Sequence, residues 1–311
     1  MAELGFFGKI PAKGDFVRHQ VTDDAARSFE QWVQESNDML RGAGGELPTE
    51  AIRVVFTPPG SAKTVVAALV PSRDKVGRKF PIVVFSLMPS EPAATHFSAL
   101  PVAWSAFLEA AVALGRQAET MEVEALRAAV NSMPSVGMEQ LSHAKGICDR
   151  ALSNPVHPEV HERLFGALEG SHLYAYHTLL TACADAKKSD PGKPSTVLDC
   201  PIRVDTDLFV WLELTARVFG FPQAPPSFFW VEDPSPRLLL TLGPAPLNTL
   251  QFIANPDLDH QRLWPLVTER AKAIEVARRA IGADVNGVSD SSPMGQLVDL
   301  IAKRAEAGGA R

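Results

Sequence analysis

Three short apolar runs in the first third of the chain place the strongest constraint on its fold. They are residues 52–57, 63–70 and 80–88, which read IRVVFT, KTVVAALV and FPIVVFSLM. Each run has the length of a β-strand and is rich in Val, Ile and Phe, which favour strands. Because the runs are apolar almost without interruption, they predict strands that are buried on both faces of a sheet.

Other segments supply the rest of a layered fold. Residues 4–10 predict a further strand, and the stretches SFFWVE and RLLLTL predict a second hairpin near residues 228–242. Helical periodicity predicts a helix that begins at Thr22 as N-cap, mostly helical structure over residues 98–186, and a helix at about residues 259–281.

This order of elements predicts an α/β (α+β) fold, in which a mixed central sheet is flanked by helices. We expect residues 1–281 to form a single domain with a helical insertion at about residues 98–195. Residues 282–311 are expected to form a linker and a short C-terminal helix.

The composition is that of a globular protein without a nucleic-acid surface. Of the 311 residues, 46% are apolar and 21% are charged, unlike the composition of a disordered chain. The net charge of −6 argues against nucleic acid as a partner, because phosphates need a basic surface. No apolar run approaches the roughly 20 residues that span a bilayer, and the N-terminus does not read as a signal peptide. We therefore expect a cytoplasmic protein without membrane insertion.

Cysteine and histidine spacing gives no sign of a metal site. Cys148, Cys183 and Cys200 contain no CxxC pair, so we expect free, buried thiols. His157 and His161 are four residues apart in HPEVH, but a proline stands where a zinc protease needs glutamate. A helix cap and a surface histidine explain them better. No nucleophile elbow or paired-carboxylate motif is present, so we expect no catalytic residue and no cofactor.

Two lysine-containing stretches resemble phosphate-binding loops but lack essential parts. TPPGSAKT ends in a Lys-Thr pair that begins at Lys63, yet Thr57 and Ala62 stand where the motif needs glycine. In GKIPAKGDF, Pro11 removes one amide from the would-be phosphate cradle. We expect that second stretch to be a turn, in which Gly14 permits positive φ and Asp15 bonds local backbone amides.

The stretch PSRDKVGRKFP, residues 71–81, is the most unusual part of the sequence. It crowds four basic residues and Asp74 into a connection between two strands. A solvated loop with internal Arg–Asp pairs is one interpretation. The other is a docking surface for an acidic or phosphorylated partner, because arginine suits bidentate contacts with such groups.

GFFGKIPAKGDFVRH, FEQWVQ and VPSRDKVGRKFPIVV together resemble the signature of the TagF (ImpM) family of type VI secretion-associated proteins. PSFFWVEDPSPRLLLTLGPAPLNTLQFI is similar to that family's second block, although Phe229-Trp230 replaces the usual Trp pair. The resemblance covers about residues 1–95 and 197–265. It implies a longin-like α/β sandwich and a non-enzymatic negative regulator of type VI secretion that acts through a forkhead-associated scaffold protein.

Two alternatives stay open beside that implied role. One is a longin-like partner of a small GTPase, and the other is an enzyme of the phosphatase or nucleotide-hydrolase class. The sequence leaves the oligomeric state undetermined.

The two glycine-containing basic stretches each flank a predicted strand, so they can share one edge of the sheet. We expect Asp15 and Asp74 to hold the arginines in place, and Gly14 and Gly77 to exclude bulky side chains. The competing hypothesis is that both aspartates form buried ion pairs with these same arginines for folding alone. Charge reversal of Arg78 to Glu separates the two hypotheses. The candidate partner-binding residues are Lys9, Lys13, Asp15, Arg73, Asp74, Gly77, Arg78 and Lys79.

Overall fold

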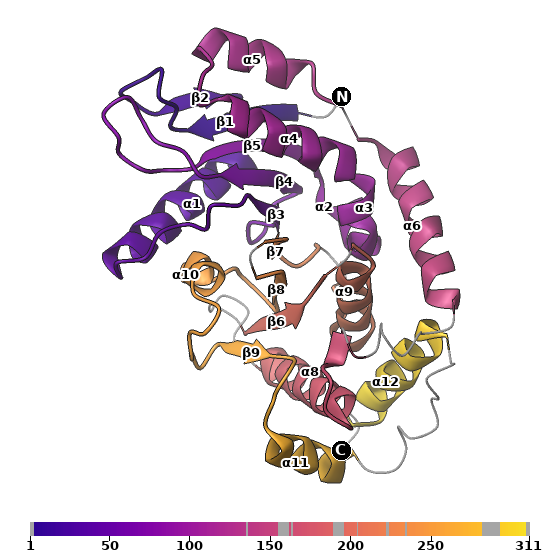
Figure 1. Cartoon of the computed structure of the whole chain (residues 1–311). Helices are drawn as coiled ribbons and strands as arrows, with labels where there is room; N and C mark the ends of the chain where they lie inside the picture. The colour runs from indigo at the N-terminus through magenta and orange to yellow at the C-terminus, as the bar shows by residue number, and fades with distance from the viewer. Residues whose placement is uncertain are drawn as a thin grey trace.

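In the computed structural model, the described residues form one nine-stranded mixed sheet with helices on both faces (Figure 1). The strand order is β2-β1-β5-β4-β3-β7-β8-β6-β9. All neighbours pair antiparallel except β6 and β9, which are parallel. The structure describes residues 3–134, 136–154, 162, 164–188, 196–203, 205–221, 224–233, 235–281 and 293–308.

The strands are short, and several coincide with the apolar runs of the sequence. They are β1 Glu3–Gly8, β2 Val17–His19, β3 Ile52–Phe56, β4 Lys63–Val70, β5 Ile82–Pro89, β6 Val197–Pro201, β7 Phe228–Val231, β8 Arg237–Thr241 and β9 Leu263–Pro265.

The helices fall into two groups by the face of the sheet that they cover. One face carries α1 (Asp24–Gly42) and α10 (Thr249–Ala254). Most other helices gather on the opposite side (Figure 1). They are α2 Ser90–Thr95, η1 Phe97–Ala99, α3 Leu100–Ala103, α4 Ser105–Gln117, α5 Val123–Asn131, α6 Met138–Ser153, α8 Ser171–Lys188, α9 Asp205–Phe219, α11 Ala271–Ile281 and α12 Met294–Gly308.

Alternation along the strands explains why both faces are buried. In β3, Val54 packs in the cluster under α1, while its neighbour Val55 packs in the cluster on the other face. Phe7 and Phe6 of β1 divide in the same way. Successive side chains of a strand point to opposite faces, so a strand covered on both sides is apolar throughout. The prediction of doubly buried strands is confirmed.

The predicted fold class and the predicted strands are confirmed, and the sheet joins both halves of the chain. β3 pairs with β7 in the register Val54↔Phe229, so the predicted second hairpin continues the same sheet. The described residues between 98 and 186 contain helices and no strand, as predicted. His157 and His161 lie outside the described residues.

The predicted helix over residues 259–281 is wrong in its first half. Residues 263–265 form strand β9, and only Ala271–Ile281 is helical. Two backbone bonds join this strand to β6: Val197 N donates to Arg262 O at 2.8 Å, and Leu266 N donates to Asp199 O at 2.9 Å. Pro265 would also interrupt a helix. Residues 263–265 therefore form a strand because they pair with the edge of β6, although their apolar spacing predicts a helix.

The strands β2 and β6 are absent from the sequence-based prediction. β2 is three residues long and pairs only at the sheet edge with β1. β6 carries Asp199 and Pro201, which lower its resemblance to a strand. At the end of the chain, α12 buries Val298 and Ile301 in the core cluster that also contains α9.

Candidate functional site

Residues 71–81, which we call the second loop, join β4 to β5 and fold back as a small hairpin. Arg73 and Lys79 form an isolated antiparallel bridge, and Asp74 N donates to Arg78 O at 3.1 Å. Gly77 closes the turn with φ of 87°. Side chains rarely adopt this left-handed conformation, so the turn itself requires glycine.

A buried carboxylate organises the second loop. The Asp74 side chain is 0% exposed. Its Oδ1 accepts hydrogen bonds from the backbone amides of Val76 (3.0 Å) and Arg78 (2.9 Å). Its Oδ2 accepts from Arg78 Nε at 2.6 Å and lies 3.1 Å from Lys9 Nζ. Each carboxylate oxygen therefore has two partners, which satisfies a buried charge.

These partners set the ionisation of Asp74. Burial alone would raise its pKa, because a dry environment disfavours the charged form. The hydrogen bonds from the Arg78 amide, from Lys9, from the Arg78 guanidinium and from the Val76 amide outweigh burial. The pKa of Asp74 is therefore held well below its ordinary value of 3.8, and the carboxylate stays charged.

Residues 9–16, which we call the first loop, are bound directly to the second loop. Lys75 N donates to Lys13 O at 2.9 Å, and Arg78 Nη2 donates to Gly14 O. Lys9 reaches Asp74 from the end of β1. GKIPAKGDF is thus a turn whose carbonyl oxygens accept hydrogen bonds from the second loop. The two loops, about sixty residues apart in the sequence, form one unit.

The ends of the two loops and the adjoining end of β1 are in equally close contact. The rings of Phe16 and Phe80 pack with their centroids 4.6 Å apart. A Cβ atom at Gly8 would lie 2.1 Å from the carbonyl oxygen of Pro81, and the φ of Gly8 is 133°. Glycine at the end of β1 lets the two chain segments approach each other closely.

Two of the expected roles in the first loop are wrong. Asp15 is exposed and has no hydrogen bond or ion pair within the described part of the chain, so it holds neither the turn nor an arginine. Gly14 has no positive φ, and a Cβ atom there would meet nothing within 4 Å. The turn is instead held by its own Lys13 N to Ile10 O bond of 3.1 Å and by the second loop.

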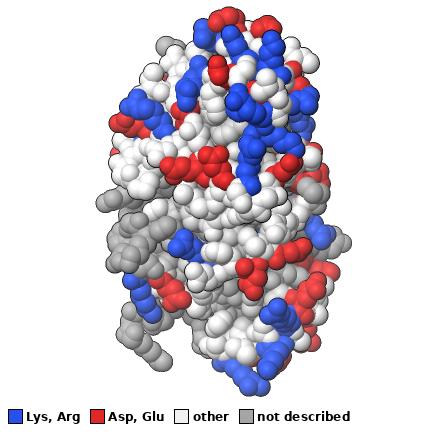
Figure 2. Space-filling view, turned by 90° about the vertical axis from the view of Figure 1, so that its left-hand side faces the viewer, with Lys and Arg blue, Asp and Glu red and all other residues white. Residues whose placement is uncertain are grey.

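The remaining candidate residues lie on the outside of the two loops. Arg73 Nη2 pairs with Glu119 at 2.9 Å, and Lys79 Nζ pairs with Glu46 at 2.6 Å. All four of these side chains are more than half exposed. The side chain of Lys13 is exposed and has no partner among the described residues. Figure 2 shows Lys and Arg side chains gathered over the upper part of the face that carries these loops.

Four further residues at this end are not among the candidate partner-binding residues. Lys75 is an exposed member of the second loop. Asn37 and Arg41 come from the last turns of α1, and Arg116 comes from the last turn of α4. Together with Arg73 and Lys79, the three helix residues line one cleft. The sequence pattern carried no signal for them, because only the packing of α1 and α4 on opposite faces of the sheet brings them to the same end.

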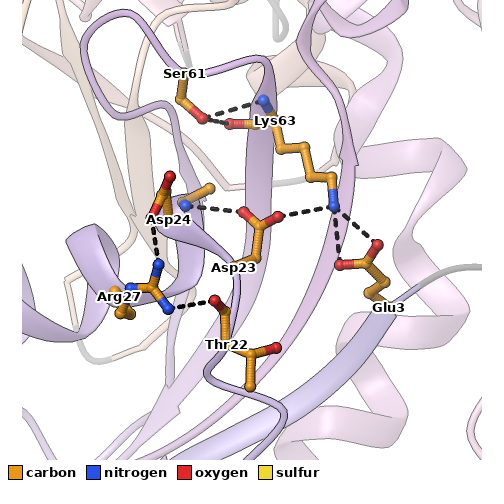
Figure 3. A network of polar contacts seen from close by, with 8 residues as sticks. Glu3, Thr22, Asp23, Asp24, Arg27, Ser61 and Lys63 are labelled. Atoms are coloured by element: carbon orange, nitrogen blue, oxygen red, sulfur yellow. Dashed lines mark hydrogen bonds and ion pairs between the residues drawn. The ribbon is translucent and has the colours of Figure 1, made fainter.

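Lys63, the lysine of the apparent phosphate loop, is engaged elsewhere (Figure 3). It opens β4, as predicted, and its Nζ donates to both carboxylate oxygens of Glu3 (2.8 and 2.9 Å) and to Asp23 Oδ2 at 2.8 Å. Asp23 also accepts from the Ala25 amide, so it caps α1 in place of the predicted Thr22. These hydrogen bonds raise the pKa of Lys63 and lower that of Asp23. Lys63 thus joins β1, β4 and the start of α1.

The described residues contain no group of three or more His, Cys, Asp or Glu side chains that could hold a metal ion. In the same part of the chain, no single helix is long and apolar enough to cross a membrane. All three cysteines are buried and free.

Comparison with known proteins places the two loops in a defined family. No curated protein matches the sequence. The crystal structure of PA0076 from Pseudomonas aeruginosa PAO1 is similar, with 18% sequence identity, a TM-score of 0.48, and coverage of 84% of this chain and 98% of that one. Residues 5–133 match the family model of the TagF N-terminal domain, described as type VI secretion system-associated. This match supports a TagF assignment for residues 5–133, the part of the chain that contains both loops.

Proposed function

We propose that this chain is a non-enzymatic, cytoplasmic binding module that restrains the type VI secretion system. In this proposal it acts through a forkhead-associated scaffold protein and contacts other components of the apparatus. Its partner-binding surface is formed by the outer side of the two loops, with Lys13, Arg73, Lys75 and Lys79 as the exposed cations.

One observation carries the proposal: Asp74 binds both Lys9 and Arg78 and so holds the two loops together, within the part of the chain that matches the TagF N-terminal domain. A rigid basic surface on a protein of net charge −6 favours an acidic partner. Complementary charge raises the association rate and fixes the orientation of the partner more than it raises affinity. Binding is therefore expected to weaken as the salt concentration rises.

Capture of partners from the native cells tests the proposal. The tagged chain should retain components of the type VI secretion system, with the forkhead-associated protein among them. The double variant Lys13→Glu/Lys75→Glu should retain less of them and should restore secretion, because both side chains are exposed and make no hydrogen bond or ion pair within the described residues. A matched control is Lys272→Glu/Arg279→Glu on α11, an exposed pair at the far end of the molecule (Figure 1).

Retention of no secretion component would contradict the proposed function. Equal retention by the parent and the Lys13→Glu/Lys75→Glu variant would contradict the proposed surface. Retention of a small GTPase in place of secretion components would support the alternative of a GTPase partner.

A further inference from the structure

A cleft of about 630 Å³ opens beside the second loop. Its walls come from the last turns of α1 and α4, from residues 44–49 and from the second loop itself. The apolar part of the lining includes Leu47, Pro48 and Phe80. The volume is within the range of binding clefts, and the lining combines these apolar residues with many polar and charged ones.

One buried polar side chain in this cleft has no partner. Asn37 on α1 is 4% exposed and lines the cleft, and its side-chain amide makes no hydrogen bond to any described residue. Its amide can both donate and accept hydrogen bonds. A ligand in the cleft would supply the hydrogen-bond partners that the described residues do not provide.

Cations surround the same cleft. Arg41, one helical turn from Asn37, makes only a long bond of 3.4 Å to the carbonyl oxygen of Lys79 and has no carboxylate partner among the described residues. Arg73, Lys79 and Arg116 pair with glutamates that are themselves exposed. Exposed ion pairs are weak, so a ligand's carboxylates could replace those glutamates at little cost.

The helix ends decide what kind of anion fits. Both α1 and α4 end at the cleft, and the C-terminal end of a helix carries a partial negative charge. That charge disfavours a compact, multiply charged anion such as pyrophosphate. An extended peptide avoids the conflict, because its N–H groups can face the helix ends and Asn37 while its acidic side chains reach the arginines.

We propose that this cleft binds an extended, acidic peptide segment of the partner protein. The proposal rests on the proposed function and extends the partner surface from the two loops to Asn37, Arg41 and Arg116. Asn37 bonds the peptide backbone, Arg41 and Arg116 bind its carboxylates, and the apolar wall receives the side chains between them.

Fluorescence anisotropy with a labelled decapeptide of alternating Glu and Leu tests the cleft directly. Asn37→Leu, which changes no charge, and Arg41→Met should each weaken binding by about tenfold. Ser72→Trp should also weaken binding, because Ser72 lines the cleft and a large side chain would fill it. Arg150→Met, an exposed site on α6 away from the loops (Figure 1), is the charge-matched control and should bind as the parent does.

Thermal unfolding of each variant establishes that it is folded, and Ser72→Trp replaces Asn37→Leu if the latter does not fold. Equal binding by the parent, Asn37→Leu and Ser72→Trp would overturn the proposal, since general electrostatic attraction would then suffice. Displacement of the decapeptide by low concentrations of pyrophosphate would also overturn it and would indicate a site for a small anion.

The same variants separate this inference from the proposed function. If the parent captures secretion components and Asn37→Leu captures them equally well, the cleft proposal fails and the proposed function stands. If the parent captures none, the proposed function fails whatever the decapeptide does.

Discussion

The ammonium nitrogen of Lys9 lies 3.1 Å from a carboxylate oxygen of Asp74, and the two side chains are only 14% and 0% exposed. Lys9 follows β1 directly, and Asp74 belongs to the second loop. Because β1 and β5 are neighbours in the sheet, this pair joins the two loops where their strands meet. The proposed partner-binding surface is thus built around a buried ion pair that stabilises the fold, while the cations on the outer side of the two loops are exposed.

Replacement of Asp74 by Asn should destabilise the protein, because Lys9 and Arg78 lose the carboxylate that they share. The pKa of Asp74 is lowered by folding, so its contribution is complete above the unfolded-state value near 3.8 and is lost as pH falls toward the folded-state pKa. Urea unfolding at pH 7, 5, 4 and 3 should show a stability difference between parent and variant that narrows below pH 3.8.

Asp15→Asn is the matched control for that series, because Asp15 is exposed and has no partner among the described residues. It should unfold as the parent does at neutral pH. If the difference in unfolding free energy between the parent and Asp74→Asn stayed constant down to pH 3, folding would not lower the pKa of Asp74.

The two loop glycines should respond differently to alanine. Gly77→Ala forces a side chain into φ of 87° and should cost about 1 kcal/mol of unfolding free energy. Gly14→Ala meets open space without positive φ and should leave stability unchanged or slightly raised. Chemical denaturation of the two variants measures this, and equal losses at both sites would refute the assignment of the strained turn to Gly77.

Charge reversal of Arg78 should destabilise the protein as well as weaken partner binding. Its Nε donates to the buried Asp74 carboxylate at 2.6 Å, so Arg78→Glu would place two carboxylates against each other. Arg78 therefore cannot separate docking from folding, and Lys13→Glu/Lys75→Glu is the variant that can. We expect the double variant to stay within about 0.5 kcal/mol of the parent's stability. An unchanged melting temperature for Arg78→Glu would be at odds with the structure.

Replacement of Lys63 should lower the stability of the fold slightly and should have no effect on nucleotide binding. Lys63→Met removes contacts with Glu3 and Asp23 that are partly exposed, so the expected loss of stability is about 1 kcal/mol or less. Calorimetry with ATP and GTP should show no binding that depends on Lys63. A micromolar affinity that disappeared in Lys63→Ala would contradict this prediction.

The cysteines should react only after unfolding. Burial raises the pKa of Cys183 to about 12 and that of Cys148 to about 11, so neither forms the reactive thiolate at neutral pH. Reaction with a thiol-specific chromogenic disulfide should follow the unfolding transition, with a lag in native buffer. Rapid labelling of the folded protein at neutral pH would mean that one of these sites opens locally.

The sequence by itself determined the elements that depend on local pattern. The runs in β3, β4 and β5 are apolar because both of their faces are covered, and that pattern is visible without knowing what covers them. The need for glycine at Gly77 could also be predicted, since a tight turn between two strands favours it. The two basic stretches that resemble the TagF family were likewise read directly from the chain.

The tertiary structure alone decided how the charges are used. Asp15 and Asp74 look alike in the sequence, each within three residues of a glycine and a lysine, yet one is exposed and the other is buried among four donors. Strand pairing between β1 and β5 makes that difference, because it brings Lys9 beside Asp74 and leaves Asp15 on the outer side. The cleft with Asn37, Arg41 and Arg116 depends in the same way on two helices that pack on opposite faces of one sheet, a contact between distant segments that no local pattern encodes.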